Sequence, residues 1–268
     1  MVSAGAGPRH PRPRRFGQNF LADTNLLDAI VRESGVEPGD VVLEIGGGGG
    51  ALSERLAPGV AVLHVIELDE GLRPELESLA EEHGNVVLTW GDAMRVDLGS
   101  LDPAPGRVVS NLPYSVATPL LLRTIEELPG VGSWTVMVQR EIADRLRAAP
   151  GSRTYGAPSV LVQLAAGVEM LRSVDRAVFS PRPRVDSALL RLTRQRPAPP
   201  AEVRELVRGA FAHRRKSMPR SLELAGGYER DAVRAALVDA GLAADARAEA
   251  LAPGDFVRVA GLLGAVTP

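Results

Sequence analysis

Short apolar runs rich in β-branched residues recur along the first half of the chain, and segments with helical spacing of apolar residues separate them. Such runs are typical of strands buried on both faces. The predicted strands cover residues 41–45, 62–68, 86–90, 107–110 and 134–139. The predicted helices cover residues 26–34, 72–82, 119–127 and 142–148. This alternation predicts an α/β domain with a parallel, doubly wound sheet, which binds ligands beyond the carboxyl ends of its strands.

The pattern changes after residue 166. Two more strands are predicted at 167–174 and 187–193, and the Pro-rich loop between them indicates an antiparallel edge pair. The segment Arg196-Pro-Ala-Pro-Pro200 can continue neither a helix nor a central strand, so we predict that the main domain covers residues 1–195. Residues 196–268 then form a small all-helical domain. Its helices are predicted at 201–212, 230–240 and 253–263.

The composition excludes several kinds of chemistry. The 268 residues contain no cysteine, so a thiolate nucleophile, a cysteine-ligated zinc ion and an iron–sulfur cluster are impossible. Residues 1–15 hold Gly, Pro and Arg without an apolar segment, which predicts no secretory signal and a cytoplasmic protein. No stretch of the sequence reaches the roughly 20 apolar residues that a membrane span needs, so we expect no membrane association.

Basic residues cluster along the chain although the net charge is only −2 at pH 7. The stretches rich in arginine and poor in acids are 1–20, 172–196 and 204–220. A GC-rich genome would also produce such a stretch, but three together favour a polyanionic partner. Within the third stretch, Arg214, Arg215 and Lys216 are the candidates for contacts with the phosphates of such a partner.

Five glycines follow the first predicted strand, in Val41-Val-Leu-Glu-Ile-Gly-Gly-Gly-Gly-Gly-Ala51. They let the backbone approach a cofactor closely, although the run alone also fits a flexible turn. Glu67 lies near the end of the next strand, where an acid can accept hydrogen bonds from ribose hydroxyls. Asp92 follows the third strand, where it can accept from the amino group of adenine. This order favours an adenosine-containing methyl donor, with a Rossmann dehydrogenase as the alternative.

The segment Asn111-Leu-Pro-Tyr114 follows the fourth predicted strand. The amino nitrogen of adenine is a poor nucleophile because its lone pair is delocalised into the ring. The Asn111 side-chain oxygen and the carbonyl of Leu112 or Pro113 can accept from its two N–H groups and draw the nitrogen toward tetrahedral geometry. Tyr114 can stack on an extruded base. Taken alone, the motif also fits an Asn-Pro turn beside a core tyrosine.

Six segments of the chain belong to one wider pattern: Arg15-Phe-Gly-Gln-Asn-Phe-Leu21, Glu44-Ile-Gly46, Val65-Ile-Glu-Leu-Asp69, Gly91-Asp-Ala93, Asn111-Leu-Pro-Tyr114 and Phe179-Ser-Pro-Arg-Pro-Arg-Val-Asp-Ser187. They resemble the ribosomal RNA adenine N6-dimethyltransferases of the KsgA type. Ala210-Phe-Ala-His-Arg-Arg-Lys216 is more similar to the small-subunit enzymes than to the Erm-type enzymes that act on large-subunit RNA. The chain departs from the family pattern where the glycine loop lacks proline, at Ser115, which is often Asn, and at Pro219, which interrupts a segment usually free of proline.

The resemblance implies a seven-stranded Rossmann-like domain that binds S-adenosylmethionine. The positions that match the cofactor residues of the family are Asn19, Leu21, Gly46, Glu67, Asp92 and Asn111. The positions that match the catalytic group are Asn111, Leu112, Pro113, Tyr114 and Phe179, and the resemblance implies that Phe179 and Tyr114 sandwich the target adenine.

The same resemblance implies dimethylation of the N6 amines of two adjacent adenines near the 3′ end of small-subunit (16S) ribosomal RNA. The substrate is then an immature small ribosomal subunit, and we expect a monomeric enzyme that needs no metal. One alternative is an Erm-type enzyme that acts on large-subunit (23S) RNA. The other is a ribosome assembly factor that has this fold and does not turn over.

Overall fold

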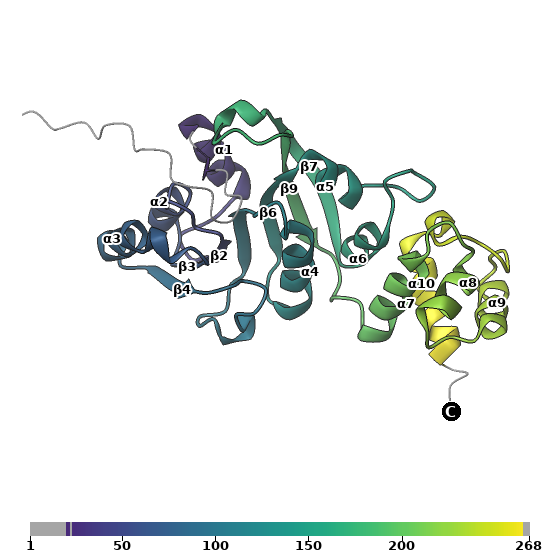
Figure 1. The fold of residues 1–268 in the computed structure, drawn as a ribbon. Coiled ribbons are helices and arrows are strands. Elements are labelled where there is room, and N and C mark those ends of the chain that lie inside the picture. Colours follow the sequence, from purple (N-terminus) through teal and green to yellow (C-terminus); the bar gives the residue numbers. More distant parts are fainter. Residues whose placement is uncertain (1–19, 22, 265–268) are drawn as a thin grey trace, which may run out of the picture.

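A seven-stranded mixed sheet forms the centre of the main domain (Figure 1). In sheet order its strands are β4 (Val86–Trp90), β3 (Val62–Glu67), β2 (Val41–Ile45), β5 (Arg107–Asn111), β6 (Ser133–Gln139), β9 (Ser187–Arg194) and β7 (Ala166–Val174). The first five run parallel, and β9 is antiparallel to both of its neighbours. The computed structural model describes residues 20, 21 and 23–264. The predicted α/β class and the seven strands are confirmed.

Helices cover both faces of the sheet. One face carries α1 (Thr24–Ser34), α2 (Ser53–Leu56) and α3 (Arg73–His83), and the other carries α4 (Ala117–Glu127), α5 (Arg140–Leu146) and α6 (Ala157–Ala165). Successive side chains of a strand point to opposite faces, so β2 contributes to both layers. Val42 belongs to the apolar cluster that contains Ile30 of α1, and Leu43 to the cluster that contains Leu120 of α4.

A second, two-stranded sheet brings distant segments together. In it β1 (Phe20–Leu21) pairs antiparallel with β8 (Phe179–Ser180), and Leu21 is the register partner of Phe179. A Cβ atom on Gly48, in the loop after β2, would lie 3.3 Å from the ring of Phe20. The N-terminal strand therefore contacts both the glycine loop and the segment between β7 and β9. Short 3-10 turns complete the connections: η1 (Ala57–Gly59), η2 (Glu70–Leu72), η3 (Leu98–Ser100), η4 (Arg176–Val178) and η5 (Ala248–Ala250).

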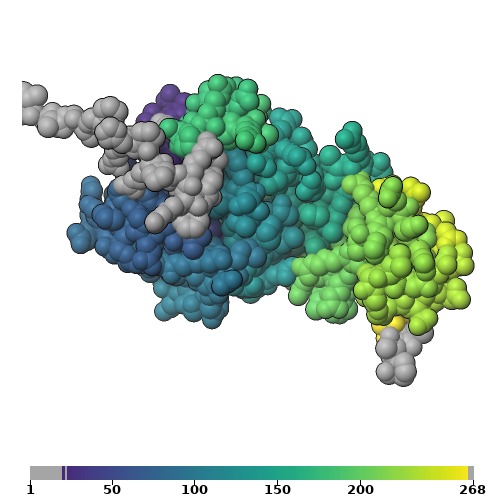
Figure 2. All heavy atoms as spheres, viewed as in Figure 1, coloured from purple at the N-terminus to yellow at the C-terminus, as the bar shows by residue number. Residues whose placement is uncertain are grey.

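The C-terminal part of the chain is a helical lobe beside the main body (Figure 2). Its helices are α7 (Ala201–Ala212), α8 (Met218–Ala225), α9 (Arg230–Asp239) and α10 (Pro253–Gly264). None of the helices within residues 23–264 is both long and apolar enough to cross a membrane. The apolar core of the lobe includes Leu206, Leu237 and Phe256, but it also includes Leu161 and Leu164 of α6. The predicted boundary at residue 196 thus falls between two segments that share one core.

Besides the single turn α2 that follows the glycine run, the structure adds two helices to the predicted ones, α6 and α8. The strands at 41–45 and 86–90 and the helix at 201–212 are as predicted, and the other predicted elements differ at their ends by one or two residues. Pro219 does not interrupt a helix. It lies in the first turn of α8, where the backbone N–H has no helical partner and proline is tolerated.

The shared core leads to a test of cooperativity. Phe256 is fully buried in the lobe, and its replacement by alanine should cost about 3 kcal/mol or more. Both tryptophans, Trp90 and Trp134, lie in the sheet, so tryptophan fluorescence reports on the main domain alone. We expect Phe256→Ala to lower the unfolding temperature seen by fluorescence as well as by far-ultraviolet circular dichroism.

The control is Leu120→Ala, which removes a buried side chain from the main core and should lower both transitions. A fluorescence transition that stays at the parental temperature in Phe256→Ala, while the helical signal melts earlier, would show that the lobe unfolds independently.

Candidate active site

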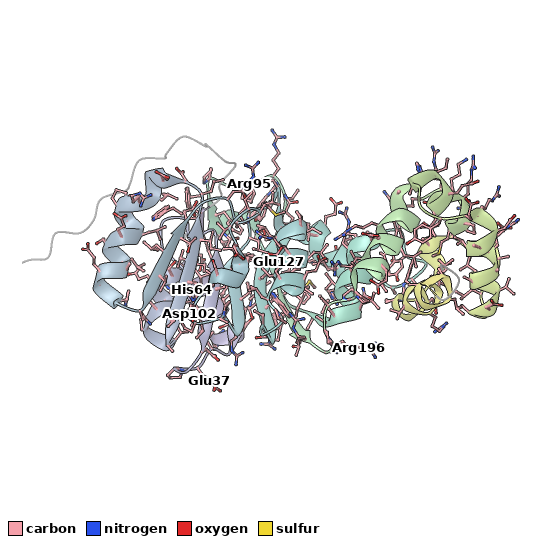
Figure 3. All side chains as sticks on the ribbon, turned by 90° about the horizontal axis from the view of Figure 1, so that it is seen from below. Glu37, His64, Arg95, Asp102, Glu127 and Arg196 are labelled. Carbon is pink, nitrogen blue, oxygen red and sulfur yellow. The ribbon has the colours of Figure 1, made fainter. Side chains whose placement is uncertain are left out.

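The predicted site residues meet at the carboxyl edge of the parallel strands. Gly46 follows β2, Glu67 ends β3, Asp92 follows β4 and Asn111 ends β5. Figure 3 shows Arg95, next to the Asp92 loop, at one edge of the sheet, with Glu37 and Asp102 toward the opposite edge. Asn19, the remaining polar cofactor candidate, lies outside the described residues. Ligands of open α/β sheets bind at this edge, so the arrangement suits a cofactor site.

The glycine loop is held in a defined conformation rather than in a loose turn. Gly46 has φ 82° and Gly48 has φ 56°, values that favour glycine. A Cβ atom on Gly46 would lie 3.5 Å from Cγ of Pro113 and 3.9 Å from the carbonyl oxygen of Asn111. The loop after β2 therefore contacts the segment after β5. This contact places the predicted cofactor loop directly beside the predicted base-binding loop.

Glu67 ties the glycine loop to the next strand. Its Oε2 atom accepts the N–H of Gly48 at 2.8 Å, and its Oε1 atom accepts the N–H groups of Leu68 and Asp69, each at 2.8 Å. The side chain is buried, at 7% exposure. A carboxylate oxygen has capacity for more than one hydrogen bond, so this fixed group can still accept from a ligand hydroxyl. Asp69 caps η2 by accepting the N–H of Gly71, as expected for a residue at a helix start.

A second buried carboxyl group, Glu44 in β2, was not predicted to have a role. Ser53 of α2 donates a hydrogen bond to its Oε2 atom at 2.6 Å. Complete burial, with a smaller contribution from the nearby charge of Glu67, raises the pKa of Glu44 from 4.5 to about 8. An acid in the middle of an apolar strand was the available sequence signal, since such groups are rarely buried while charged.

The Asp92 loop forms a tight turn. The Oδ1 atom of Asp92 accepts the N–H of Met94 at 2.9 Å, and its carbonyl oxygen accepts the N–H groups of Arg95 at 2.7 Å and Val96 at 2.9 Å. The carboxylate is 43% exposed and lies 3.7 Å from Nε of Arg95. The turn therefore fixes the Asp92 side chain through one carboxylate oxygen, while the carboxylate stays accessible, as an acceptor for a ligand must be.

Backbone bonds fix the segment after β5. The N–H of Leu112 donates to the carbonyl of Met137 at 3.1 Å, and the N–H of Ile45 donates to Oγ of Ser110 at 2.8 Å. The carbonyl of Pro113 accepts the N–H of Val116 at 3.1 Å. The sequence offered the carbonyl of Leu112 or that of Pro113 as the second acceptor, and the Pro113 carbonyl is already hydrogen-bonded within the turn. The Leu112 carbonyl is the better candidate for the second acceptor.

Tyr114 and Phe179 come together, but not as two parallel plates. Their ring centroids are 6.3 Å apart and the rings meet edge to face, with an interplanar angle of 76°. The Tyr114 hydroxyl is hydrogen-bonded to Oγ of Ser187. Burial raises the pKa of Tyr114, partly offset by that hydrogen bond. A base can lie between the two rings only after they move apart, so the predicted sandwich is not preformed.

Three basic residues follow α7, namely Arg214, Arg215 and Lys216, and Arg214 is bonded to other segments of the chain. Nε of Arg214 lies 3.1 Å from Oε2 of Glu249, and its Nη2 donates to the carbonyl of Arg153 at 2.6 Å. All three residues are exposed, so Arg214 differs from Arg215 and Lys216 in these bonds and not in its exposure. Arg214 therefore links the lobe to the loop between α5 and α6. The sequence grouped the three cations together because the contact with Glu249 is not visible in the local pattern.

The buried Glu44 leads to a pH prediction. Because its folded pKa is raised, the folded protein keeps a proton that the unfolded chain releases above pH 4.5, so its contribution to stability falls as pH rises from about 4.5 to about 8. Glu44→Gln cannot release this proton. Between pH 5 and pH 8 we expect the variant to gain about 3 kcal/mol relative to the parent, measured by urea unfolding.

Glu54→Gln, at an exposed position of α2, is the matched control and should show no such change relative to the parent. A parallel dependence on pH in the parent and in Glu44→Gln would contradict a raised pKa for Glu44.

Comparison with known proteins identifies the family. Residues 10–264 match the family model described as ribosomal RNA adenine dimethylase. Ribosomal RNA small subunit methyltransferase A of Rubrobacter xylanophilus is 44% identical, over 96% of this chain and 97% of that protein. The protein of the same name from Deinococcus radiodurans is 43% identical, over 94% of this chain and 86% of its own length.

Solved structures share the fold. A dimethyladenosine transferase from Plasmodium falciparum has a TM-score of 0.75 at 24% identity, covering 89% of this chain and 95% of that one. The 23S rRNA methyltransferase ErmE has a TM-score of 0.65 at 27% identity, covering 92% and 100%. With the match to the family model over nearly the whole chain, these findings show that the protein is an S-adenosylmethionine-dependent methyltransferase of the ribosomal RNA adenine dimethylase family.

Proposed function

We propose that the protein transfers methyl groups from S-adenosylmethionine to the N6 amines of two adjacent adenines near the 3′ end of 16S ribosomal RNA. The observation that carries this proposal is the contact between the glycine loop and the segment after β5, where Gly46 abuts Pro113 and Asn111. In the proposal, the methyl donor lies on the glycine loop and the acceptor amine on the segment after β5, so this contact brings them side by side. The names and identities of the bacterial small-subunit methyltransferases support the choice of substrate.

The residues at the carboxyl edge fit the methyl donor. Glu67 is positioned to accept from ribose hydroxyls and Asp92 from the adenine amino group, while Gly46 leaves room for close backbone approach. Leu21, held by β8, is proposed to close the pocket, together with Asn19 and Asn111. S-adenosylmethionine supplies an electrophilic methyl group on a positively charged sulfonium, which suits an edge with acidic residues.

The chain activates the amine through acceptors. The Asn111 side-chain oxygen and the Leu112 carbonyl accept the two N–H groups, which localises the nitrogen lone pair and aims it at the methyl carbon. The nitrogen–carbon bond forms as the carbon–sulfur bond breaks, and the leaving group is the neutral thioether. The methylated nitrogen is then acidic enough to lose its proton to water. Pro113 keeps an N–H group out of this pocket.

The target base is proposed to lie between Tyr114 and Phe179. The two rings now contact each other edge to face, so in this proposal the base replaces that one contact with stacking on each ring. Stacking on both faces would hold an adenine that has left its RNA stack. The hydrogen bond between the hydroxyl groups of Tyr114 and Ser187 holds one of the two rings in place.

RNA phosphates are proposed to contact the basic residues after α7, chiefly the exposed Arg215 and Lys216, with Arg214 holding the adjoining loop. The substrate is then an immature small ribosomal subunit, bound by a monomer. Since ErmE shares the fold over its full length, the architecture does not by itself separate small-subunit from large-subunit RNA. The higher identity to the small-subunit enzymes favours the former.

The direct test is to incubate the purified protein and labelled S-adenosylmethionine with unmethylated small-subunit particles, and separately with large-subunit RNA. We expect label as dimethyladenine at two adjacent positions of 16S RNA. Label confined to 23S RNA would favour the Erm-type alternative. No label in either RNA would favour the assembly factor.

Loss of the Asn111 acceptor should reduce the chemical step. We expect Asn111→Ala to lower single-turnover methylation by roughly 100-fold, since a group that acts in the transition state is removed. Asn85→Ala is the control, because the Asn85 amide donates to the carbonyls of Ala57 and Val60 at the opposite edge of the sheet. A parental single-turnover rate in Asn111→Ala would contradict the acceptor mechanism.

The basic residues give a prediction about binding. Arg215→Ala with Lys216→Ala should weaken binding to small-subunit particles and flatten its dependence on salt by roughly one unit of slope per lost phosphate contact. Arg220→Ala is the matched control, because Arg220 is ion-paired with Glu223 in α8. The double variant should keep parental affinity for S-adenosylmethionine. An unchanged salt slope would remove Arg215 and Lys216 from the RNA-binding surface.

A further inference from the structure

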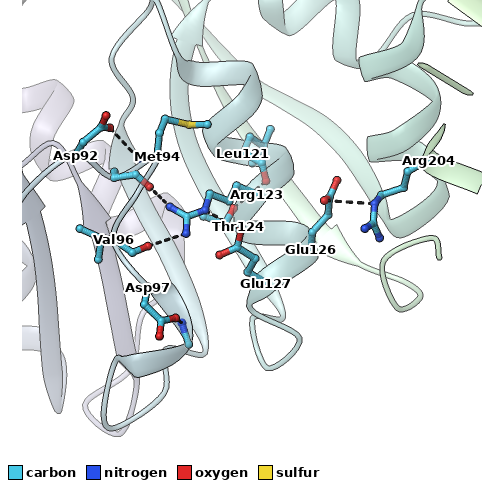
Figure 4. A network of polar contacts seen from close by, with 12 residues as sticks. Asp92, Met94, Val96, Asp97, Leu121, Arg123, Thr124, Glu126, Glu127 and Arg204 are labelled. Atoms are coloured by element: carbon cyan, nitrogen blue, oxygen red, sulfur yellow. Dashed lines mark hydrogen bonds and ion pairs between the residues drawn. The ribbon is translucent and has the colours of Figure 1, made fainter. Parts of the chain in front are cut away.

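Arg123 is a mostly buried cation in the middle of α4, and its side chain points at the loop after β4 (Figure 4). It is 15% exposed. Nη2 donates to the carbonyl of Val96 at 2.6 Å, and Nη1 donates to the carbonyl of Ala93. Nε donates to Oε1 of Glu127, one turn along α4, at 2.7 Å. The guanidinium thus joins two backbone carbonyls of one loop to one helix.

The two carbonyls belong to the turn that carries Asp92. Bonds within the turn, from Met94, Arg95 and Val96 to Asp92, set its shape. Other contacts set its place in the domain: the N–H of Gly91 donates to the carbonyl of Glu67 at 2.9 Å, and Ala93 and Val96 pack against the main core. The bonds from Arg123 add a direct tie to α4 on both sides of the turn, because Ala93 directly follows Asp92 and Val96 closes the same turn.

The helix that carries Arg123 is itself firmly placed. Leu120, Leu121 and Ile125 of α4 are buried in the main core. On α4 next to Arg123's turn, Glu126 lies 3.4 Å from Arg204 and 3.3 Å from Arg208 of α7. The loop is therefore attached to a helix that is packed into the main core and ion-paired with α7.

Arginine suits this position better than lysine. Its planar fork presents several donors in fixed directions and can bond two carbonyls and a carboxylate at once. Removing it leaves two carbonyls of a partly buried loop without their donor, which favours a shift of the loop toward water. The spacing of Arg123 and Glu127 along α4 is that of an ordinary helix-surface ion pair and gives no sign of the two carbonyl bonds.

We propose that Arg123 is a positioning residue of the cofactor pocket, which sets the Asp92 carboxylate in place to accept from the adenine amino group of the methyl donor. The proposal rests on the proposed function, because it assumes that Asp92 receives that amino group. Arg123 acts through the loop and does not contact the donor. Its loss should therefore impair recognition of adenine in particular, rather than binding in general.

The probes are S-adenosylhomocysteine and S-inosylhomocysteine. They differ at one position of the purine, where the adenosine form carries an amino group that donates and the inosine form carries a carbonyl group that accepts. The parent protein should bind the adenosine form more tightly, and Asp92→Ala should remove most of this preference. We expect Arg123→Ala to bind S-adenosylhomocysteine roughly tenfold more weakly by calorimetry and to lose most of the preference as well. Arg123→Lys should recover part of the loss.

Two further variants separate positioning from general damage. Glu127→Gln keeps both carbonyl bonds of Arg123, so its affinity for both probes should stay within about twofold of the parent, as expected for loss of a half-exposed ion pair. In the Asp92→Ala background, Arg123→Ala should add little, because the two residues act through one hydrogen bond. Thermal unfolding confirms that each variant is folded at the assay temperature.

The outcomes are distinct. If Asp92→Ala loses the preference and Arg123→Ala keeps it, the positioning role is wrong while the proposed pocket stands. Equal weakening of both probes in Arg123→Ala, with the preference unchanged, would show a merely structural role and would also overturn the proposal. If Asp92→Ala itself keeps the parental preference, the assignment of the cofactor pocket fails.

Discussion

The arrangement of the site depends on three hydrogen bonds that the Glu67 carboxylate accepts from backbone N–H groups. The carboxylate joins the glycine loop after β2 to the turn after β3, so two neighbouring strands end in one rigid edge. Glu44 lies one strand away on the same sheet, and its pKa is raised to about 8. Near neutral pH it keeps its proton, so the edge avoids a second buried charge while Glu67 accepts its hydrogen bonds.

The remaining parts of the site are assembled on this edge by contacts between distant segments. Gly46 meets Pro113, the ring of Phe20 covers Gly48, and the pairing of β1 with β8 puts Leu21 opposite Phe179. Each contact joins a segment proposed to hold the methyl donor to one proposed to hold the base or to close over it. In-line transfer needs donor and acceptor at a fixed separation, and these contacts supply that constraint.

The sequence predicted the sheet and the strand-end residues well because both follow from local pattern. Parallel strands end at one edge, so Glu67, Asp92 and Asn111 had to lie near each other once the alternation of strands and helices was recognised. The pattern did not predict α6, whose continuous apolar run shows no single polar face because both cores cover it. It did not predict α8 because Pro219 suggested an interruption, whereas proline is accepted in a first helical turn.

What the sequence could not predict depends on contacts between distant residues. Arg214 was grouped with its neighbours, although its partner Glu249 lies in another segment of the lobe. The edge-to-face contact of Tyr114 and Phe179 depends on the β1–β8 pairing and on Ser187, none of which a local pattern specifies. Likewise, the carbonyls that Arg123 holds are 30 and 27 residues away in sequence, so no local pattern could indicate these bonds.

A crystal structure of the protein with S-adenosylhomocysteine and adenosine bound would test the central claim most directly, namely that one edge of the sheet holds both donor and acceptor. The account predicts ribose hydroxyls at Glu67, the cofactor adenine amino group at Asp92, and the N6 atom of the adenosine between the Asn111 side chain and the Leu112 carbonyl, facing the thioether sulfur. Cofactor bound away from Glu67, or an adenosine whose N6 atom points away from Asn111, would contradict it.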